Sequence, residues 1–74
     1  MELTVKQYDA LERAITHGHR ISVFRRGTEF MVIPERIVVR GRRECIEARH
    51  PTTGDHLSIW VDEVDAVEVV EVVR

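Results

Sequence analysis

The spacing of the apolar residues changes once along the chain, at Gly18, and this change constrains the fold more than any other feature. Before Gly18, apolar residues recur at three- and four-residue intervals: Val5, Tyr8, Leu11, Ala14 and Ile15. This spacing is typical of one buried face of an α-helix. After Gly18, apolar and polar residues alternate, which is typical of strands with one buried face. The sequence therefore predicts an amphipathic helix followed by β-structure.

Both ends of the helix carry local signals. Thr4 is a favourable N-cap, and Gln7 stands three residues later, where its side chain can return a hydrogen bond to the cap. Leu3 and Tyr8 are spaced to form a hydrophobic staple across this end. Gly18 can adopt the left-handed conformation that ends a helix. The helix is expected over about residues 4–17.

Turn signals divide the rest of the chain into about five strands within residues 20–73. Gly27, Gly41 and Gly54 are nearly evenly spaced, as a meander requires. Pro34 interrupts the long segment 29–40 and marks a bulge, a bend or an edge there, because proline has no N–H for a sheet ladder. We predict a mostly β (α+β) fold in one domain, 1–74: the N-terminal helix followed by a five-stranded antiparallel SH3/Sm-like barrel. An open α+β sheet is the alternative.

A chain of 74 residues cannot bury a large core and usually needs an additional source of stability. Cys45 is its only cysteine, so no intrachain disulfide is possible. Tight packing or self-association must compensate, and the valine-rich segment 67–73 is either a central strand or an edge for a homo-oligomer. An export signal and a run of about 20 apolar residues are both missing, which indicates a cytoplasmic protein without a membrane anchor.

Arginine is concentrated in the middle of the chain. Residues 20–49 carry eight arginines and four glutamates, whereas residues 50–74 carry one arginine and six acidic residues. Arginine forks bind phosphates and exposed aromatic rings stack on bases, so a nucleic-acid surface is one interpretation. Its candidate residues are Arg25, Arg26, Arg40, Arg42, Arg43 and Trp60. The alternatives are solvated arginines at opposite ends of a meander, arginines paired with acidic groups, a high-GC genome, and a Trp60 buried under the helix.

Signals for catalysis or metal binding are weak. Cys45 lies between two glutamates in a predicted strand, an environment that does not favour a reactive thiolate, although Arg43 shares its face. The chain has no nucleophile elbow, phosphate loop or zinc-protease motif. Four histidines could in principle converge on a metal, but their spacing favours helix capping and solvated turns: His17, His19, His50 and His56. We predict a non-enzymatic protein without a metal or cofactor.

The helix resembles that of the Rho-binding antiterminator (Rof) family through Tyr8, Asp9, Leu11, Glu12 and Ala14, followed by His17 and an amphipathic strand at 21–23. The resemblance extends loosely to residues 57–64. It implies an N-terminal helix on an Sm-like barrel and a protein that docks on the termination factor Rho. It places Tyr8, Asp9 and Glu12 at or near the contact surface. The sequence departs from the family at Lys6 and Gln7, where a cysteine-aspartate pair is expected, and in its many arginines.

A second resemblance is to the WYL domain, another Sm-like barrel of bacterial regulators. It rests on residues 34–38, the strand around Ala48, the turn 51–54 and residues 61–64, while the Trp-Tyr-Leu signature itself is missing. Together these observations predict a small regulatory binding module of bacterial transcription or RNA metabolism. A protein partner is expected, possible partners being Rho or other transcription machinery. Direct RNA or DNA binding and a self-associating structural barrel are the alternatives.

Overall fold

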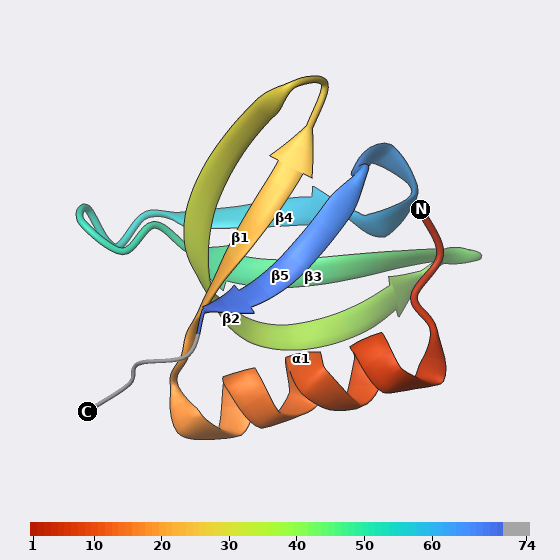
Figure 1. Cartoon of the computed structure of the whole chain (residues 1–74), viewed down its shortest axis with the longest axis horizontal. Coiled ribbons are helices and arrows are strands. Elements are labelled where there is room, and N and C mark those ends of the chain that lie inside the picture. The colour runs from red at the N-terminus through yellow and green to blue at the C-terminus, as the bar shows by residue number, and fades with distance from the viewer. Residues whose placement is uncertain (71–74) are drawn as a thin grey trace.

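The computed structural model describes residues 1–70 as an N-terminal helix followed by five antiparallel strands (Figure 1). The elements are α1 (Val5–His17), β1 (Arg20–Arg25), β2 (Thr28–Arg40), β3 (Arg43–Arg49), β4 (His56–Trp60), the short 3-10 helix η1 (Val61–Glu63) and β5 (Ala66–Val70). The predicted mostly β, α+β architecture is confirmed. The last strand was expected to reach residue 73, and its residues 71–73 lie outside the described part.

The helix forms where its local signals predicted. The Thr4 hydroxyl accepts a hydrogen bond from the Gln7 N–H at 3.1 Å, and the Thr4 N–H donates to the Gln7 side chain at 2.9 Å. Gly18 ends the helix with φ of 69°, a conformation that strains residues with a β-carbon. This turn lets the His19 N–H donate to the Ala14 carbonyl at 2.9 Å. Both helix ends are therefore satisfied by neighbouring residues.

We expect Thr4→Ala to lower the free energy of unfolding by about 1 kcal/mol, because it leaves the Gln7 N–H without its acceptor. Denaturant unfolding followed by far-UV circular dichroism measures this loss. Thr16→Ala is the matched control, since Thr16 is exposed and donates only to the Glu12 carbonyl of its own helix. An unchanged midpoint for Thr4→Ala would contradict the importance of the cap.

The sheet has the strand order β4-β3-β2-β1-β5. Consecutive strands pair from β1 to β4, and β5 then returns beside β1, with Ile21 opposite Val69. The long strand β2 pairs with both β1 and β3, and its register against β3 shifts between Pro34 and Arg36. Pro34 is buried at this shift. The expected irregularity at Pro34 is confirmed, and it lets β2 bend from one half of the sheet into the other.

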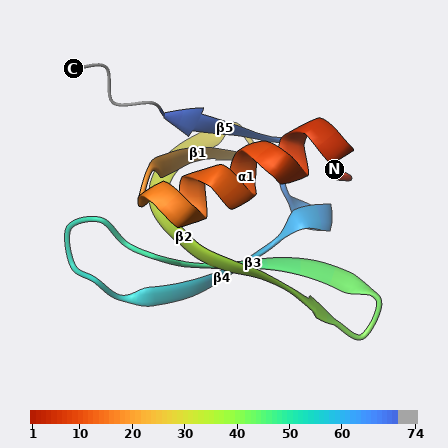
Figure 2. The same cartoon turned by 90° about the horizontal axis from the view of Figure 1, so that it is seen from below.

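The sheet curls without closing into the expected barrel (Figure 2). Within residues 1–70, β4 pairs only with β3 and β5 pairs only with β1, so these two strands are the edges. Each edge strand has five residues, and η1 lies between them in the chain. Val61 and Val64 are buried there, so side chains rather than ladder hydrogen bonds fill this junction. In the described residues, the predicted valine-rich strand is therefore an edge and not a central strand.

The core lies inside the curled sheet, and α1 covers one end of it (Figure 2). Ile21, Val32, Ile46 and Ile59 come from the strands and are at most 1% exposed. The helix adds Leu11 and Ala14, while the Met1 ammonium donates to the carbonyls of Val61 at 3.0 Å and Val64 at 2.9 Å. In residues 1–70, no helix is both long and apolar enough to cross a membrane. The packing of α1 positions the residues expected to contact a partner.

Candidate functional site

The three residues expected at a partner contact all lie on α1, but only two share a cavity. Tyr8 and Glu12 line a groove of about 250 Å³ between α1 and the bent strand β2, whereas Asp9 is exposed beside it. The remaining lining residues are Ile15, Thr16, Glu35, Arg36 and Ile37. The register shift after Pro34 lies immediately before the part of β2 that forms this wall. The groove is thus assembled from two segments that are distant in the sequence.

The α1–β2 groove combines an apolar surface with acidic groups. Tyr8, Ile15 and Ile37 are half-buried and leave part of their surface to solvent. Arg36, the only basic residue lining it, donates to the Glu47 carboxylate at 2.6 Å and is already paired. Glu12 forms no ion pair within residues 1–70. The uncompensated charge of the groove is therefore negative. The groove is complementary to a partner that presents one basic and one apolar side chain.

Two of the arginines proposed for nucleic-acid binding are occupied by carboxylates of the same chain. Arg40 pairs with Glu47, which Arg36 also contacts. Arg43 holds Asp62 with two hydrogen bonds of 2.8 Å and reaches Glu63 at 2.9 Å. These pairs support the alternative in which arginines pair with acidic groups, and Arg43 reaches two acidic residues of the segment 50–74. Part of the donor capacity of both guanidinium groups is therefore used within the chain.

Trp60 is neither buried under α1 nor openly available for stacking. It is half-buried and pairs across the sheet with Cys45, while its neighbour Ile59 points into the core, so Trp60 lies on the outer face. The Arg43 guanidinium carbon lies 4.2 Å from the centre of the Trp60 ring. This cation–π contact covers one ring face. Cys45 is fully buried, which agrees with the prediction of a packed thiol.

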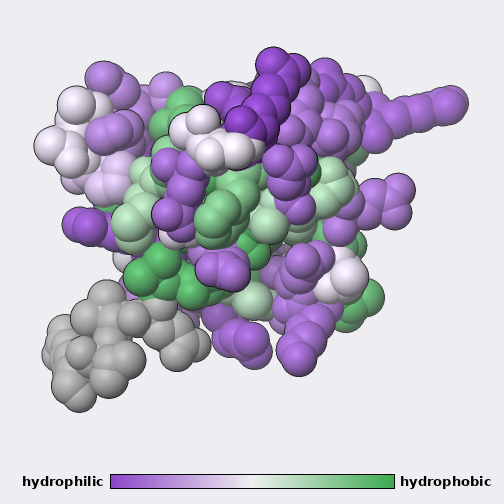
Figure 3. All heavy atoms as spheres, turned by 45° about the horizontal axis from the view of Figure 1, so that its top comes forward, coloured by the Kyte–Doolittle hydropathy of each residue, from purple (hydrophilic) through white to green (hydrophobic). Residues whose placement is uncertain are grey.

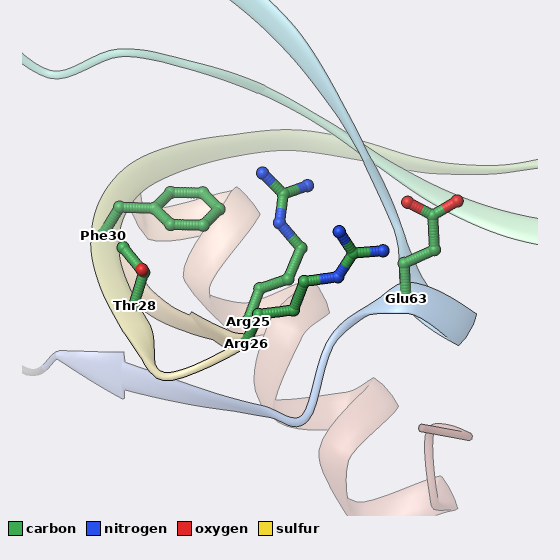
Figure 4. Close-up of a pocket in the computed structure, with 5 residues that line it drawn as sticks. All are labelled: Arg25, Arg26, Thr28, Phe30 and Glu63. Atoms are coloured by element: carbon green, nitrogen blue, oxygen red, sulfur yellow. The ribbon is translucent and has the colours of Figure 1, made fainter.

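Arg25 and Arg26 lie in a different environment, at the turn between β1 and β2. Neither forms an ion pair within the described chain, and both line a pocket of about 330 Å³ together with Thr28, Phe30 and Glu63 (Figure 4). Because Glu63 also binds Arg43, η1 connects the two arginine-bearing turns that the meander alone would separate. The fifth arginine, Arg42, is exposed on the next turn.

The sequence interpretation missed Thr28, Phe30 and Glu63 of the Arg25–Phe30 pocket and the β2 residues of the α1–β2 groove. For Phe30 a signal existed: a two-residue turn at 26–27 aligns Val23 with Phe30 and places Arg25 on the same face. The Arg25 guanidinium carbon lies 5.4 Å from the Phe30 ring centre. For Glu63 and for Ile37 of the α1–β2 groove there was no local signal, because their positions depend on η1 and on the bend of β2.

Because of the ion pairs of Arg43 and Arg40, the free energy of unfolding is expected to decrease at acid pH. Hydrogen bonds from Arg43 lower the pKa of Asp62, and hydrogen bonds from Arg40 and Arg36 lower the pKa of Glu47. A carboxylate with a lowered pKa stabilises the fold above its unfolded pKa, about 4. That contribution is lost as the pH falls through the lower folded pKa. We expect the free energy of unfolding to fall from about pH 5 toward pH 2, and Arg43→Gln to make this decline shallower.

Denaturant unfolding across this pH range measures the effect. Arg42→Gln is the matched control, because Arg42 is an exposed neighbour without an ion pair in the described chain. A pH profile that Arg43→Gln leaves unchanged would show that the Arg43 pairs contribute nothing to stability.

The histidines do not assemble a metal-binding group. The rings of His17 and His19 stack with centres 5.6 Å apart at the end of α1, and His56 lies 3.0 Å from the Glu35 carboxylate. Within residues 1–70, no three histidine, cysteine or acidic side chains gather as metal ligands would. His17 and His19 also line a pocket of about 230 Å³ beside Ala14.

The described residues define a small α+β protein with an N-terminal helix and a five-stranded antiparallel sheet. Comparison with known proteins adds no family, since no family model matches the sequence and no curated protein matches it either.

Proposed function

We propose that this chain is a non-enzymatic binding module that regulates bacterial transcription or RNA metabolism by docking on a larger protein. The observation that carries this proposal is the α1–β2 groove, where Tyr8 and Glu12 share a surface with Ile37. The groove offers partly exposed apolar groups and an unpaired carboxylate, which suits recognition of a protein segment. Catalysis is not needed for such a role.

The mechanism is steric. An apolar side chain of the partner packs against Tyr8, Ile15 and Ile37, and a basic side chain pairs with Glu12 at the rim. Asp9, exposed on the next turn of the same helix, adds to the negative field that guides the encounter. When the partner segment is bound in the groove, the curled sheet sterically blocks other ligands from binding to the same part of the partner.

The resemblance of α1 to the Rho-binding antiterminator family identifies Rho as the candidate partner. That family is expected to carry an Sm-like barrel, and the helix, the bent β2 and the pairing of β5 with β1 support a relationship to such barrels. The open junction between β4 and β5 is a departure from a closed barrel. The relationship to the family is part of the proposal and rests on the helix residues.

The proposal is tested by capture of purified Rho on the immobilised protein. A C-terminal tag is suitable, because it leaves the hydrogen bonds of the Met1 ammonium intact. We expect nuclease-resistant capture that Tyr8→Ala and Glu12→Arg each weaken at least about tenfold, since aromatic anchors and complementary charges dominate such interfaces. Repeating the capture from bacterial lysate, at low and moderate salt, extends the search to polymerase and other transcription proteins.

Glu68→Arg is the matched control for Glu12→Arg, because it makes the same charge reversal at an exposed position of β5 that lies outside the α1–β2 groove. Circular dichroism and the unfolding midpoint establish that each variant is folded. Capture that Glu68→Arg weakens as much as Glu12→Arg would contradict docking through this groove. Material that is released by nuclease would instead favour direct nucleic-acid binding.

A further inference from the structure

The β1–β2 turn lies at the end of the molecule away from α1 (Figure 1), and the pocket at this turn shares no lining residue with the α1–β2 groove. In Figure 4 the Phe30 ring lies on one side of the Arg25 guanidinium, and Arg26 and Glu63 lie on the other. The Thr28 hydroxyl completes the lining. Figure 3 tilts this end toward the viewer and shows hydrophilic side chains gathered around apolar ones. Positive charge and an aromatic surface therefore meet within one cavity of about 330 Å³.

The turn that carries the two arginines is held in place by the rest of the fold. Arg26 and Gly27 adopt φ of 52° and 77°, and a two-residue type I′ hairpin turn requires positive φ at both of these positions. The Arg26 N–H donates to the Asp65 carboxylate at 3.0 Å, and the Asp65 N–H donates to the Phe24 carbonyl at 2.7 Å. These contacts tie the turn to the segment after η1. The backbone at Arg25 and Arg26 is thus held in position before any ligand binds.

The charges around the pocket favour an anion. Among the lining residues, two guanidinium groups stand against one carboxylate, that of Glu63, which also accepts a hydrogen bond from Arg43 at 2.9 Å. Asp65 is adjacent and accepts from the Arg26 backbone. The Arg25 and Arg26 guanidinium groups have no such partner within residues 1–70. Guanidinium forks match phosphate oxygens and can also stack on flat rings.

We propose that this pocket binds one nucleotide unit, with the phosphate on Arg25 and Arg26 and the base stacked against Phe30. A phosphate ion alone would make no contact with the Phe30 ring. An uncharged aromatic ligand would leave Arg25 and Arg26 without an ionic partner. Base stacking on aromatic side chains and phosphate contacts commonly combine in this way. The volume fits a ligand of this size, at the lower end of small-molecule pockets. The nucleotide comes either from a free mononucleotide or from a single-stranded nucleic acid.

Nuclear magnetic resonance titration of the ¹⁵N-labelled chain tests this assignment. Four probes are added separately: adenosine monophosphate, an adenosine RNA hexamer, ribose 5-phosphate and inorganic phosphate. We expect amide shifts from Arg25 to Phe30 and at Glu63 with the first two probes, and binding at least about tenfold weaker for the two probes that lack a base. Tighter binding of the hexamer, falling steeply with salt, identifies a strand as the source. Preference for the mononucleotide identifies the free ligand.

Arg25→Gln and Phe30→Leu remove the charge and the ring separately. Each is expected to weaken nucleotide binding about tenfold, and the spectrum itself shows whether the variant is folded. Because Phe30 also packs against the core, Arg25→Gln decides the matter if Phe30→Leu is poorly folded. Arg20→Gln is the matched control, since it removes an exposed arginine at the other end of β1.

Three results would overturn the proposal. The first is no shift in these residues at about 10 mM nucleotide, well beyond a weak millimolar affinity. The second is equal affinity for inorganic phosphate and nucleotide, which removes the role of Phe30. The third is equal weakening by Arg20→Gln and Arg25→Gln, which reduces the effect to net charge. Each of these is independent of capture through the α1–β2 groove.

Discussion

Ile46→Ala is expected to leave most of the chain unfolded at 25 °C. Ile46 is fully buried and lies between its strand partners Ile37 and Ile59, at the centre of the half of the sheet that β2, β3 and β4 form. Truncating a buried isoleucine to alanine costs about 2–5 kcal/mol. A domain of this size rarely has more than about 3–5 kcal/mol of stability to lose. The expected loss therefore matches the whole stability.

Denaturant unfolding and the dispersion of a proton spectrum measure this outcome. Val39→Ala is the matched control, because Val39 lies two residues from Ile37 on the same strand but is 67% exposed. We expect Val39→Ala to change the free energy of unfolding by less than about 0.5 kcal/mol. A folded Ile46→Ala variant with a wild-type midpoint would mean that the core described for this half of the sheet is not what stabilises the chain.

Ala14→Glu is expected to be nearly as damaging, by at least about 3 kcal/mol, because it forces a carboxylate into the contact between α1 and the sheet. Ala14 has no exposed surface and belongs to the core cluster with Leu11. The core cluster contains no basic side chain, and Arg13, His17 and His19 lie at its edge in a pocket that Ala14 also lines. The helix must either leave the sheet or place a carboxylate against apolar side chains. The α1–β2 groove would be lost with it, so the same variant should also abolish capture of the partner.

The unfolding midpoint, the helical circular dichroism signal and capture of Rho are the three measurements for this variant. Lys6→Glu is the matched control, because it introduces the same side chain at an exposed position in the first turn, where the helix dipole favours a negative charge. Ala14→Glu that unfolds at the wild-type denaturant concentration would contradict the placement of this helix face against the sheet.

The helix shows how far local signals reach. Thr4 and Gln7 stand three residues apart, and their reciprocal hydrogen bonds need no other part of the chain. Gly18 likewise ends the helix through its own backbone conformation. Ile46 and Ala48 alternate with polar residues and are both buried, since the side-chain period of a strand is fixed at two. These features were predictable because each depends on neighbours in the sequence.

The candidate sites could be predicted only in part. Tyr8 and Glu12 were singled out by resemblance, but their partner Ile37 comes from a strand whose path depends on the bend after Pro34. The arginines looked alike in the sequence. In the structure, Arg43 holds Asp62 and covers Trp60, whereas Arg25 forms no ion pair in the described chain. Which arginine meets a carboxylate depends on contacts between residues 7 to 20 positions apart, from Arg40 and Glu47 to Arg43 and Glu63.

By itself, the sequence determined the helix with its two caps, the number of strands and the inward-facing residues, because hydrogen bonds within a few residues and the periods of helix and strand set them. Only the tertiary structure decided that the sheet stays open between β4 and β5, that η1 brings Glu63 to Arg43, and that Trp60 lies outside under a guanidinium. These arrangements follow from how a bent β2 and a short η1 place distant side chains against one another. Contacts between residues this far apart in the chain leave no trace in local sequence spacing.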